Sequence, residues 1–393
     1  MERKIVGYFP NWAVYREGSA KFGVEDINPK LFTHLIYAFA ILDEKNFSIK
    51  AFDNWNDIEN RGFKKFTKLK RENKELKVMI AIGGWTDSQT IDNFNKYSAL
   101  VASDRNIEKF VDSSLKFLKE YGFDGLDLDW EYPSTTQDKN GFSKLISALK
   151  SKFKPHGYLL SAAVPGSSDA ITNGYFVHAL NENLDFINLM AYDFYGPWEK
   201  TQANHHSPLE AIEGEKNVKS AVKNWLSNGM EAAKINLGIP LYGKCWELSC
   251  GGTCSCPFIP PLSANGPGSP GPSTKEAGTM AYFEICDAVR NKGWKVYNSS
   301  IKVEEGGWFS WLKSSSPSNS PRNEKMGPYA VSPSCPKMWV GYDDPNMVAV
   351  KSQYILSKNL GGAMLWDISF DDFEDGKKSN PVLTNAIYRT LNP

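Results

Sequence analysis

The chain has 393 residues, enough for one large domain or two ordinary ones. Hydrophobic residues make up 41% of it, which provides the apolar surface for a sizeable core and argues against disorder over most of its length. Lysine plus arginine and aspartate plus glutamate both number 45, and this net charge of zero argues against nucleic acid or an anionic membrane as a partner.

Short strand-like segments alternate along the chain with longer segments of helical periodicity. The predicted strands are 4–9, 33–39, 77–82, 124–130, 158–164, 185–190, 235–241 and 361–366. The predicted helices are 57–71, 104–120 with Ser103 as its N-cap, 141–153, 173–183, 217–230 and 347–359. Eight strands that alternate with helices predict an α/β fold, a (β/α)8 TIM barrel. A doubly wound open sheet is the alternative, but it predicts a G-x-G-x-x-G turn that the sequence lacks.

The regular spacing breaks once, between the seventh and eighth predicted strands. Residues 242–360 are too many for a single crossover, and they include the turn-rich run 261–273 and a helix-like segment at 280–292. We therefore expect a barrel made of 1–242 and 346–393, interrupted by an α+β insertion subdomain at 243–345. In a TIM barrel the loop after strand seven lies on the active-site face.

All six cysteines lie inside this interval. They are Cys245, Cys250, Cys254, Cys256, Cys286 and Cys335. An even number in one region predicts a local disulfide framework, whose pairing the sequence leaves open, and disulfides indicate a secreted, extracellular protein whose signal peptide has been removed. A zinc site is the alternative for the C-x-x-x-C-x-C run, but this spacing matches zinc patterns weakly and no histidine lies nearby. No segment has the roughly 18 consecutive apolar residues of a membrane span.

The stretch FDGLDLDWEYP, residues 123–133, places three acids at alternate positions of a predicted strand. Because strand side chains alternate between two faces, Asp127, Asp129 and Glu131 share one face and the apolar residues between them share the other. The apolar face suits the surrounding helices, so the acids are expected to line the barrel interior towards its carboxyl-terminal mouth. With no lysine or arginine in the run, burial and coupling predict a raised pKa for at least one acid.

A protonated acid at the mouth of a pocket is the group that general acid catalysis of glycoside cleavage requires. Two other interpretations of the acidic row stay open on the pattern alone. One is an ordinary strand with a single solvated face, and the other is a divalent-metal site with further oxygen ligands from elsewhere.

DGLDLDWE, residues 124–131, has the D-G-x-D-x-D-x-E signature, and the sequence here resembles glycoside hydrolase family 18, the chitinases. The resemblance covers nearly the whole chain. Six further stretches resemble the family's strand motifs: GYFPNW the first, FTHLIYAFA the second, AIGGW the third, MAYDFYGPW the sixth, GIPLYG the seventh and GGAMLWD the eighth. The insertion resembles the small α+β domain of the longer chitinases. This resemblance implies a monomeric, endo-acting hydrolase of β-1,4 linkages in chitin or chitooligosaccharides, with no cofactor or metal.

The resemblance also implies a substrate-assisted retaining mechanism. Glu131 is expected to be the acid and base, Asp129 to orient the substrate N-acetyl group, and Asp127 to share a proton with Asp129. Tyr192 is expected to donate a hydrogen bond to the acetamido oxygen. Asp124 has the opposite parity and is expected to be structural.

Further residues are expected to bind the sugar chain. Asp193 is expected to contact the sugar or the acid, and Met190 to pack beneath the acetamido group. The remaining residues expected at the substrate are Gly84 and a set of aromatic rings that follow or end barrel strands, namely Tyr8, Trp12, Phe39, Trp85, Trp198, Tyr242 and Trp366. Core packing is the alternative for any single ring. Lys244 stands where family members often carry arginine, so a point charge replaces a bidentate contact.

Two rival functions stay open on the resemblance. One is a catalytically weak or inactive chitin-binding lectin on the same fold, since several family members have lost the acid; the presence of Glu131, Asp129 and Tyr192 favours the enzyme. The other is an endo-N-acetylglucosaminidase acting on N-glycans. Such members generally lack the insertion, which this chain contains.

Overall fold

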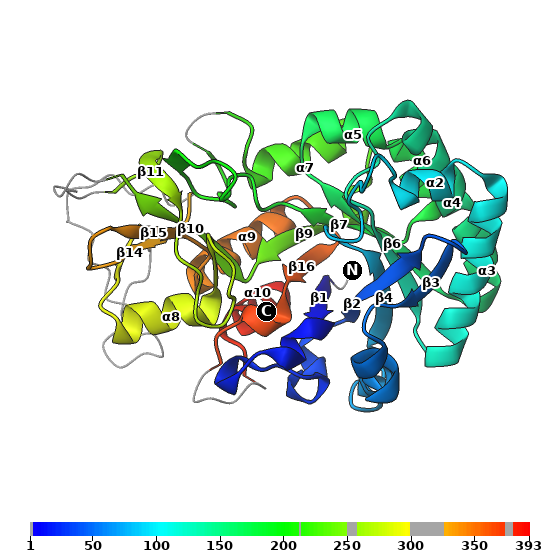
Figure 1. The fold of residues 1–393 in the computed structure, drawn as a ribbon, viewed down its shortest axis with the longest axis horizontal. Coiled ribbons are helices and arrows are strands. Elements are labelled where there is room, and N and C mark those ends of the chain that lie inside the picture. The colour runs from blue at the N-terminus through cyan, green and yellow to red at the C-terminus, as the bar shows by residue number, and fades with distance from the viewer. Residues whose placement is uncertain (1–2, 212–213, 250–257, 299–325, 374–379) are drawn as a thin grey trace.

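A computed structural model describes residues 3–211, 214–249, 258–298, 326–373 and 380–393. Eight parallel strands form a closed barrel (Figure 1). They are β1 (Lys4–Pro10), β2 (His34–Asp43), β4 (Lys77–Gly83), β5 (Gly125–Asp129), β6 (Leu159–Pro165), β7 (Phe186–Met190), β9 (Ile235–Pro240) and β16 (Gly362–Trp366). Strand β1 pairs with both β16 and β2, which closes the ring. The predicted TIM barrel is confirmed.

Helices surround the barrel. They are α1 (Gly62–Thr67), α2 (Lys96–Val101), α3 (Asp104–Tyr121), α4 (Thr136–Phe153), α5 (Ser168–Gly174), α6 (Val177–Asn183), α7 (Val218–Ser227), α9 (Pro345–Ser357) and α10 (Val382–Leu391). Ser103 caps α3 as predicted, since its hydroxyl accepts a hydrogen bond from the Asn106 N–H at 3.4 Å. Helix α4 begins five residues earlier than predicted, because Thr135 and Asp138 form a capping box.

Two predicted helices are broken in the structure. The segment 57–71 contains a π-helix (Asn54–Glu59), then α1, then a 3-10 turn (Lys68–Arg71), and the break after the π-helix comes at Arg61, whose φ is 62°. The segment 173–183 contains only the last residues of α5 and then α6. Tyr175 and Phe176 between these two helices have extended backbone, which ends one helix and starts the next.

A second sheet follows β9. Its strands are β10 (Tyr242–Leu248), β11 (Leu262–Pro267), β12 (Thr279–Ala281), β13 (Lys295–Tyr297), β14 (Tyr329–Val331) and β15 (Met338–Gly341), and α8 (Tyr282–Asn291) follows β12. The order is β13-β14-β15-β10-β11-β8, with β12 beside β10. Strand β8 (Gln202–Ala203) comes from the barrel loop after β7, a contribution that the sequence pattern did not predict. Strand β3 (Ser48–Ala51) forms an antiparallel hairpin with β2.

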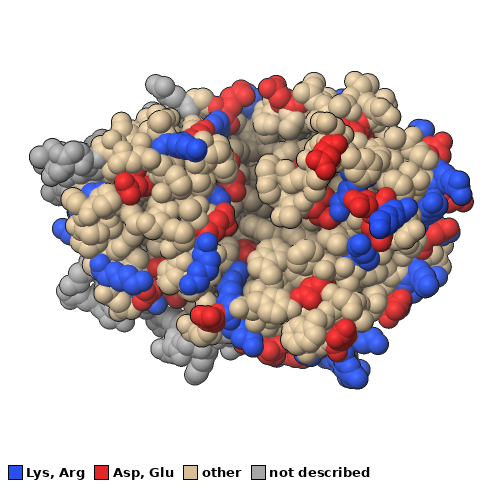
Figure 2. Space-filling view, viewed as in Figure 1, with Lys and Arg blue, Asp and Glu red and all other residues tan. Residues whose placement is uncertain are grey.

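The sheet insertion between the seventh and eighth barrel strands is therefore confirmed, while its limits of 243–345 stay a prediction. In Figure 1 it lies to the left of the barrel, and Figure 2 shows a furrow between the two parts. Cys245, Cys286 and Cys335 are free thiols, and Cys250, Cys254 and Cys256 lie outside the described residues. The predicted disulfide framework is thus not seen in the described part of the chain.

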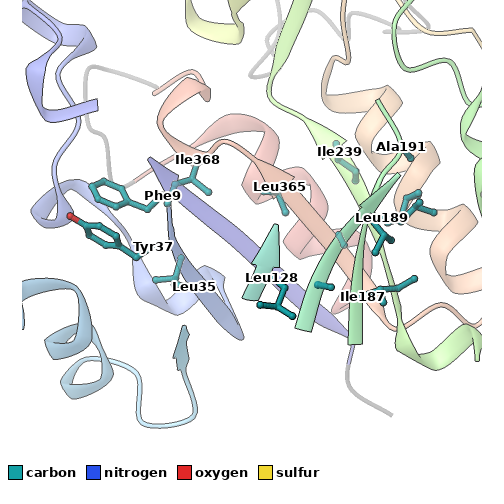
Figure 3. Packing of buried hydrophobic residues seen from close by; sticks show 14 of the residues in the cluster. Phe9, Leu35, Tyr37, Leu128, Ile187, Leu189, Ala191, Ile239, Leu365 and Ile368 are labelled. Carbon is teal, nitrogen blue, oxygen red and sulfur yellow. The ribbon is translucent and has the colours of Figure 1, made fainter. Parts of the chain in front are cut away.

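Apolar side chains pack in two layers on either side of the barrel wall. The outer layer lies between strands and helices and includes Leu126, Leu128 and Trp130, as the strand parity predicted. Figure 3 shows part of this layer, with Leu128 on β5 and further apolar side chains on other barrel strands, such as Leu35 on β2 and Ile187 on β7. A smaller cluster, which includes Tyr8 and Met364, fills the barrel interior. No helix in the described part of the chain is long and apolar enough to cross a membrane.

Candidate active site

Asp127 lies fully buried on the inner face of β5 and is held by three donors. Its Oδ2 accepts a hydrogen bond from the Tyr8 hydroxyl at 2.6 Å, and its Oδ1 accepts from Ser161 Oγ at 2.5 Å and Asn188 Nδ2 at 3.3 Å. Burial raises the pKa of Asp127 to about 6, although these hydrogen bonds lower it. This acid is therefore built into the barrel wall by groups on β1, β6 and β7.

Asp129, two residues further along β5, is the least satisfied of the three acids. It is 4% exposed, and within the described residues its Oδ1 is buried without a hydrogen-bond partner. Burial raises the pKa of Asp129 well above its usual range, and the negative charges of Glu131 and Asp127 raise it further. A buried, unpaired carboxyl oxygen is costly, so this site is suited to a ligand that supplies a donor.

Glu131 follows the end of β5 and reaches the barrel mouth. Burial raises its pKa to about 7, a hydrogen bond from Tyr132 lowers it, and the charge of Asp193 raises it. The backbone N–H of Glu131 donates to Ser88 Oγ at 3.0 Å, which fixes the backbone at this point. Near neutral pH a carboxyl group with this pKa exists in both protonation states, which a group that must donate and later accept a proton needs.

The neighbouring strand β4 approaches the end of β5 very closely. The φ of Gly83 is 116°, and a Cβ on this residue would lie 2.2 Å from the carbonyl oxygen of Asp129. Gly84 donates its backbone N–H to the same carbonyl at 2.8 Å, and a Cβ there would meet the Phe39 ring at 2.8 Å. Glycine is required at both positions by this packing. The structure thus places Gly84 beneath Phe39 as a support for the acidic strand.

Asp124 lies at the foot of the same strand and has a structural role, as expected. Its Oδ2 accepts a hydrogen bond from the Val78 N–H at 2.8 Å, and its Oδ1 pairs with Lys70 at 2.8 Å. These contacts join β4, β5 and the turn after α1 at the end of the barrel opposite the three acids.

Met190 ends β7, and Tyr192 and Asp193 follow it. Because β6 separates β7 from β5, these residues reach the barrel mouth two strands away from the three acids. Tyr192 lies in contact with Met364, its hydroxyl 3.9 Å from the sulfur, and its ring is 6.1 Å from that of Tyr242. Burial raises the pKa of the Tyr192 hydroxyl, and Asp129 and Asp193 raise it further, so this group is a neutral donor.

Asp193 has a left-handed backbone with a φ of 56°, and three side chains surround its carboxylate. The Tyr242 hydroxyl donates to Oδ1 at 2.7 Å, His206 Nδ1 lies 3.1 Å from Oδ1, and Lys244 Nζ lies 3.5 Å from Oδ2. Burial raises the pKa of Asp193, but Lys244, His206 and Tyr242 together bring it below its usual value. Asp193 is therefore an anion beside Glu131.

Four of the predicted aromatic residues form a continuous wall. The Trp366 ring lies 5.5 Å from Tyr8 and 5.8 Å from Phe39, and Phe39 lies 6.1 Å from Trp12, with each distance between ring centroids. Trp12 is 38% exposed at the outer end of this row. Trp12 and Trp366 expose part of their rings along this row, whereas Tyr8, which is 1% exposed, is packed in the barrel interior, so core packing holds for Tyr8.

Trp85 and Trp198 extend the aromatic surface away from the wall. They follow β4 and β7, and they are 64% and 57% exposed. The Lys244 ammonium lies 5.9 Å from the centroid of the Trp198 ring and 5.2 Å from that of Tyr242. Core packing, the alternative for these two tryptophans, is excluded by their exposure. It holds for other tryptophans, since Trp225, Trp246 and Trp339 are fully buried.

Five further residues at the site were missed by sequence reasoning. They are Ser88, Tyr132, Ser161, Asn188 and His206. Ser161 and Asn188 gave a signal, because each is a lone polar residue in an apolar strand segment. Ser88 and His206 lie in loops, where no periodicity marks the direction of a side chain.

The metal-site interpretation of the acidic row has no support in the structure. Among the described residues, no group of three or more His, Cys, Asp or Glu side chains has the arrangement of a metal site. The Asp127 carboxyl instead binds two hydroxyl groups and one amide, and the Asp129 Oδ1 has no partner among the described residues. A TIM barrel with a row of buried acids at its carboxyl-terminal mouth is an arrangement typical of glycoside hydrolases.

The family follows from comparison with known proteins. Residues 4–371 match the profile described as glycosyl hydrolases family 18, and the chain belongs to this family. It is 37% identical to the probable chitinase 10 of Drosophila melanogaster over 396 aligned positions, which cover 97% of this chain and 16% of that protein.

Two solved structures are similar over almost the entire chain. One is catalytic domain 2 of the Group II chitinase of Ostrinia furnacalis, with 36% identity and a TM-score of 0.85 over 99% of this chain and 96% of that one. The other is human YKL-39, described as a pseudo-chitinase with retained chitooligosaccharide binding properties. It has 32% identity and a TM-score of 0.83, and the alignment covers 100% of both chains.

Proposed function

We propose that the protein is a chitinase that hydrolyses β-1,4 linkages between N-acetylglucosamine units. The observation that carries this proposal is that Glu131 and Asp129 lie next to each other and have different properties. Glu131 has a pKa of about 7 at the barrel mouth, and the Asp129 Oδ1 beside it is buried without a partner among the described residues. The first group suits proton transfer to a glycosidic oxygen, and the second suits an acetamido N–H.

The proposed reaction has two steps and retains the anomeric configuration. Glu131 donates its proton to the glycosidic oxygen while the substrate's acetamido oxygen attacks the anomeric carbon, so one C–O bond breaks as another forms. The acetamido N–H donates a hydrogen bond to Asp129, whose negative charge stabilises the positive oxazolinium ion. Glu131 then takes a proton from water, and the water oxygen attacks the anomeric carbon. The bond between that carbon and the acetamido oxygen breaks, which opens the oxazolinium ring and restores the acetamido group.

Neighbouring side chains complete the proposed mechanism. Tyr192, a neutral donor, would bind the acetamido oxygen, and Met190 would pack against its methyl group. Asp127, with its pKa of about 6, would exchange a proton with Asp129. Trp12, Phe39 and Trp366 and the outer rings of Trp85 and Trp198 would contact successive sugars, while Tyr8, which is 1% exposed, would support Trp366 from the barrel interior.

The second candidate function is a lectin that binds chitooligosaccharide without cleaving it. The structural likeness to YKL-39, a pseudo-chitinase, favours it. Glu131, which a lectin does not need, favours the enzyme.

The experiment is hydrolysis of chitotetraose by the wild type and by Glu131→Gln, followed by anomeric NMR and mass spectrometry. We expect β-anomeric products from the wild type and at least about a thousandfold loss in the variant. Glu17→Gln, an exposed position, is the matched control. Intact sugar that binds to the wild type would establish the lectin instead.

An endo mode, a monomeric state and an extracellular location are further parts of the proposal. Trp12 and Trp198 lie exposed after different strands, and such spread-out rings suit a long chain that extends beyond the site in both directions. Early products of several lengths from chitohexaose would support endo cleavage, whereas chitobiose alone would contradict it.

A further inference from the structure

His206 lies in the loop between β8 and α7, fully buried behind Asp193. Its two ring nitrogens have different neighbours. Nε2 lies 3.2 Å from the carbonyl oxygen of Tyr242, which has no hydrogen to give, so Nε2 must be the donor. A neutral ring with its hydrogen on Nε2 leaves Nδ1 bare.

Nδ1 faces two groups of Asp193 that require opposite protonation states. The backbone N–H of Asp193 points at Nδ1 from 3.4 Å, a contact that only a bare nitrogen can accept. The carboxylate Oδ1 of the same residue lies 3.1 Å from Nδ1, a contact that is attractive only when Nδ1 carries a hydrogen. Protonation of the ring thus exchanges a main-chain contact for a side-chain contact with one residue.

We propose that His206 is a proton-dependent positioning residue, which binds the Asp193 carboxylate through Nδ1–H when protonated and releases it when neutral. This inference rests on the proposed function for its effect on catalysis. When the ring is neutral, the lone pair of Nδ1 repels Oδ1, and the Tyr242 hydroxyl and Lys244 are left to hold the carboxylate. The negative charge of Asp193 is then less compensated beside Glu131.

The charges around the ring come from every element that packs against it. Asp193 after β7, Lys244 on β10 and Asp343 after β15 act on it directly, and its neighbour His205 stacks on it at 5.9 Å. Lys351 on α9 lies behind them, where it pairs with Asp343 and donates to Ser207.

Burial lowers the pKa of His206 and Asp193 raises it, with a net value below the usual one. The switch therefore operates on the acidic side of neutrality.

The consequence is specific to acidic solution. Below its pKa, His206 is charged, binds the carboxylate and partly neutralises it. As the pH rises through that value, the ring loses its second proton, the field of Asp193 at Glu131 strengthens, and Glu131 keeps its own proton to higher pH, because Asp193 raises the pKa of Glu131. Loss of one proton at His206 thus helps to retain another at Glu131.

The direct test is nitrogen NMR of the histidine rings in uniformly 15N-labelled protein from pH 4.5 to 8. The chain has five histidines, and His206→Asn identifies the resonances of His206 by their absence. We expect Nε2 to stay protonated throughout while Nδ1 changes from protonated to bare as the pH rises. A Nδ1 that keeps one state over the whole range would overturn the proposal, and this readout requires no activity.

The kinetic test uses the ratio of kcat/KM in His206→Asn to that in the wild type. Asparagine can donate to Asp193 at every pH but carries no charge, so the ratio should change across the His206 titration by about threefold to tenfold, the factor of one ordinary hydrogen bond. A merely structural role gives a ratio that is independent of pH, which would also overturn the proposal. His156→Asn, at an exposed position, is the control and should give a constant ratio.

If the wild type cleaves no chitooligosaccharide, the proposed function fails, and the same ratio is measured on the dissociation constant of chitotetraose. If His206→Asn does not fold, His206→Gln replaces it in the kinetic comparison and in the assignment of the His206 resonances, and the NMR titration of the wild type still tests the proposal. The proposal and the proposed function can thus fail separately.

Discussion

Tyr8 on β1 donates a 2.6 Å hydrogen bond across the barrel interior to Asp127 on β5. The same hydroxyl accepts a hydrogen bond from Asn188 on β7 at 2.8 Å. Three strands that are not neighbours are therefore joined through one phenolic oxygen, which positions the first acid of the row.

Replacing Tyr8 by phenylalanine tests this link. The variant leaves Asp127 Oδ2 without its donor and Asn188 without one acceptor, and we expect a loss of about 1–3 kcal/mol in the free energy of unfolding. The pKa of Asp127 should rise further, because the lost hydrogen bond lowers it. Urea denaturation at pH 7 measures the loss. Tyr388→Phe, at a partly exposed position on α10, should change the free energy by less than about 0.5 kcal/mol.

Glu131 should reduce the stability of the folded protein at neutral pH. Its folded pKa of about 7 lies above the ordinary value of 4.5, so the folded state binds more protons than the unfolded state between these values. Stability therefore falls as the pH rises through this window. Glu131→Gln removes the penalty and should stabilise the protein by about 1–3 kcal/mol at pH 7.5, with little difference at pH 4. Thermal denaturation of both proteins at the two pH values measures this, and equal differences at both would contradict it.

Two tryptophans of the candidate site should behave differently on truncation. Trp85 is 64% exposed, so Trp85→Ala should leave the melting temperature unchanged and raise KM for chitotetraose about two- to tenfold through lost stacking. Trp366 packs against Tyr8 and Phe39, so Trp366→Ala should also lower the melting temperature. A fall in stability for Trp85→Ala would show that this ring supports the fold.

The strands were predictable because their apolar character is continuous and each is short. All eight barrel strands begin within one residue of the predicted positions. The inward direction of Asp127 and Asp129 followed from strand alternation, and their burial without a cationic partner explains the raised pKa values that the pattern predicted. The roles of individual site residues came from the family resemblance and stay proposals.

What the pattern missed depends on contacts between distant segments. Strand β8 has two residues and gains its partner only when β11 lies beside it. His206 follows β8 closely, and its relation to Asp193 depends on the turn between them and on β10. The break at Arg61 depends on a left-handed backbone that no periodicity reveals. Local sequence determines the strands, whereas tertiary contacts determine these features.

Lys351 and Asp343 provide the last prediction. Both side chains are fully buried, and the Lys351 ammonium contacts the Asp343 carboxylate at 2.5 Å and the Ser207 carbonyl at 2.7 Å. Lys351→Met leaves Asp343 as a buried charge without a cation, which should cost about 3–5 kcal/mol of stability. Adding Asp343→Asn removes that charge and should restore at least half of the loss.

An exposed ion pair is the matched comparison for this experiment. Lys144 and Asp104 lie 3.0 Å apart with side chains 62% and 83% exposed, and Lys144→Met should cost less than about 1 kcal/mol because solvent screens the pair. Urea denaturation of the four proteins, including the double variant, separates burial from pairing. If the double variant were as unstable as Lys351→Met, the loss would come from the ammonium's hydrogen bonds to Ser207, and the carboxylate of Asp343 would not be the source of the penalty.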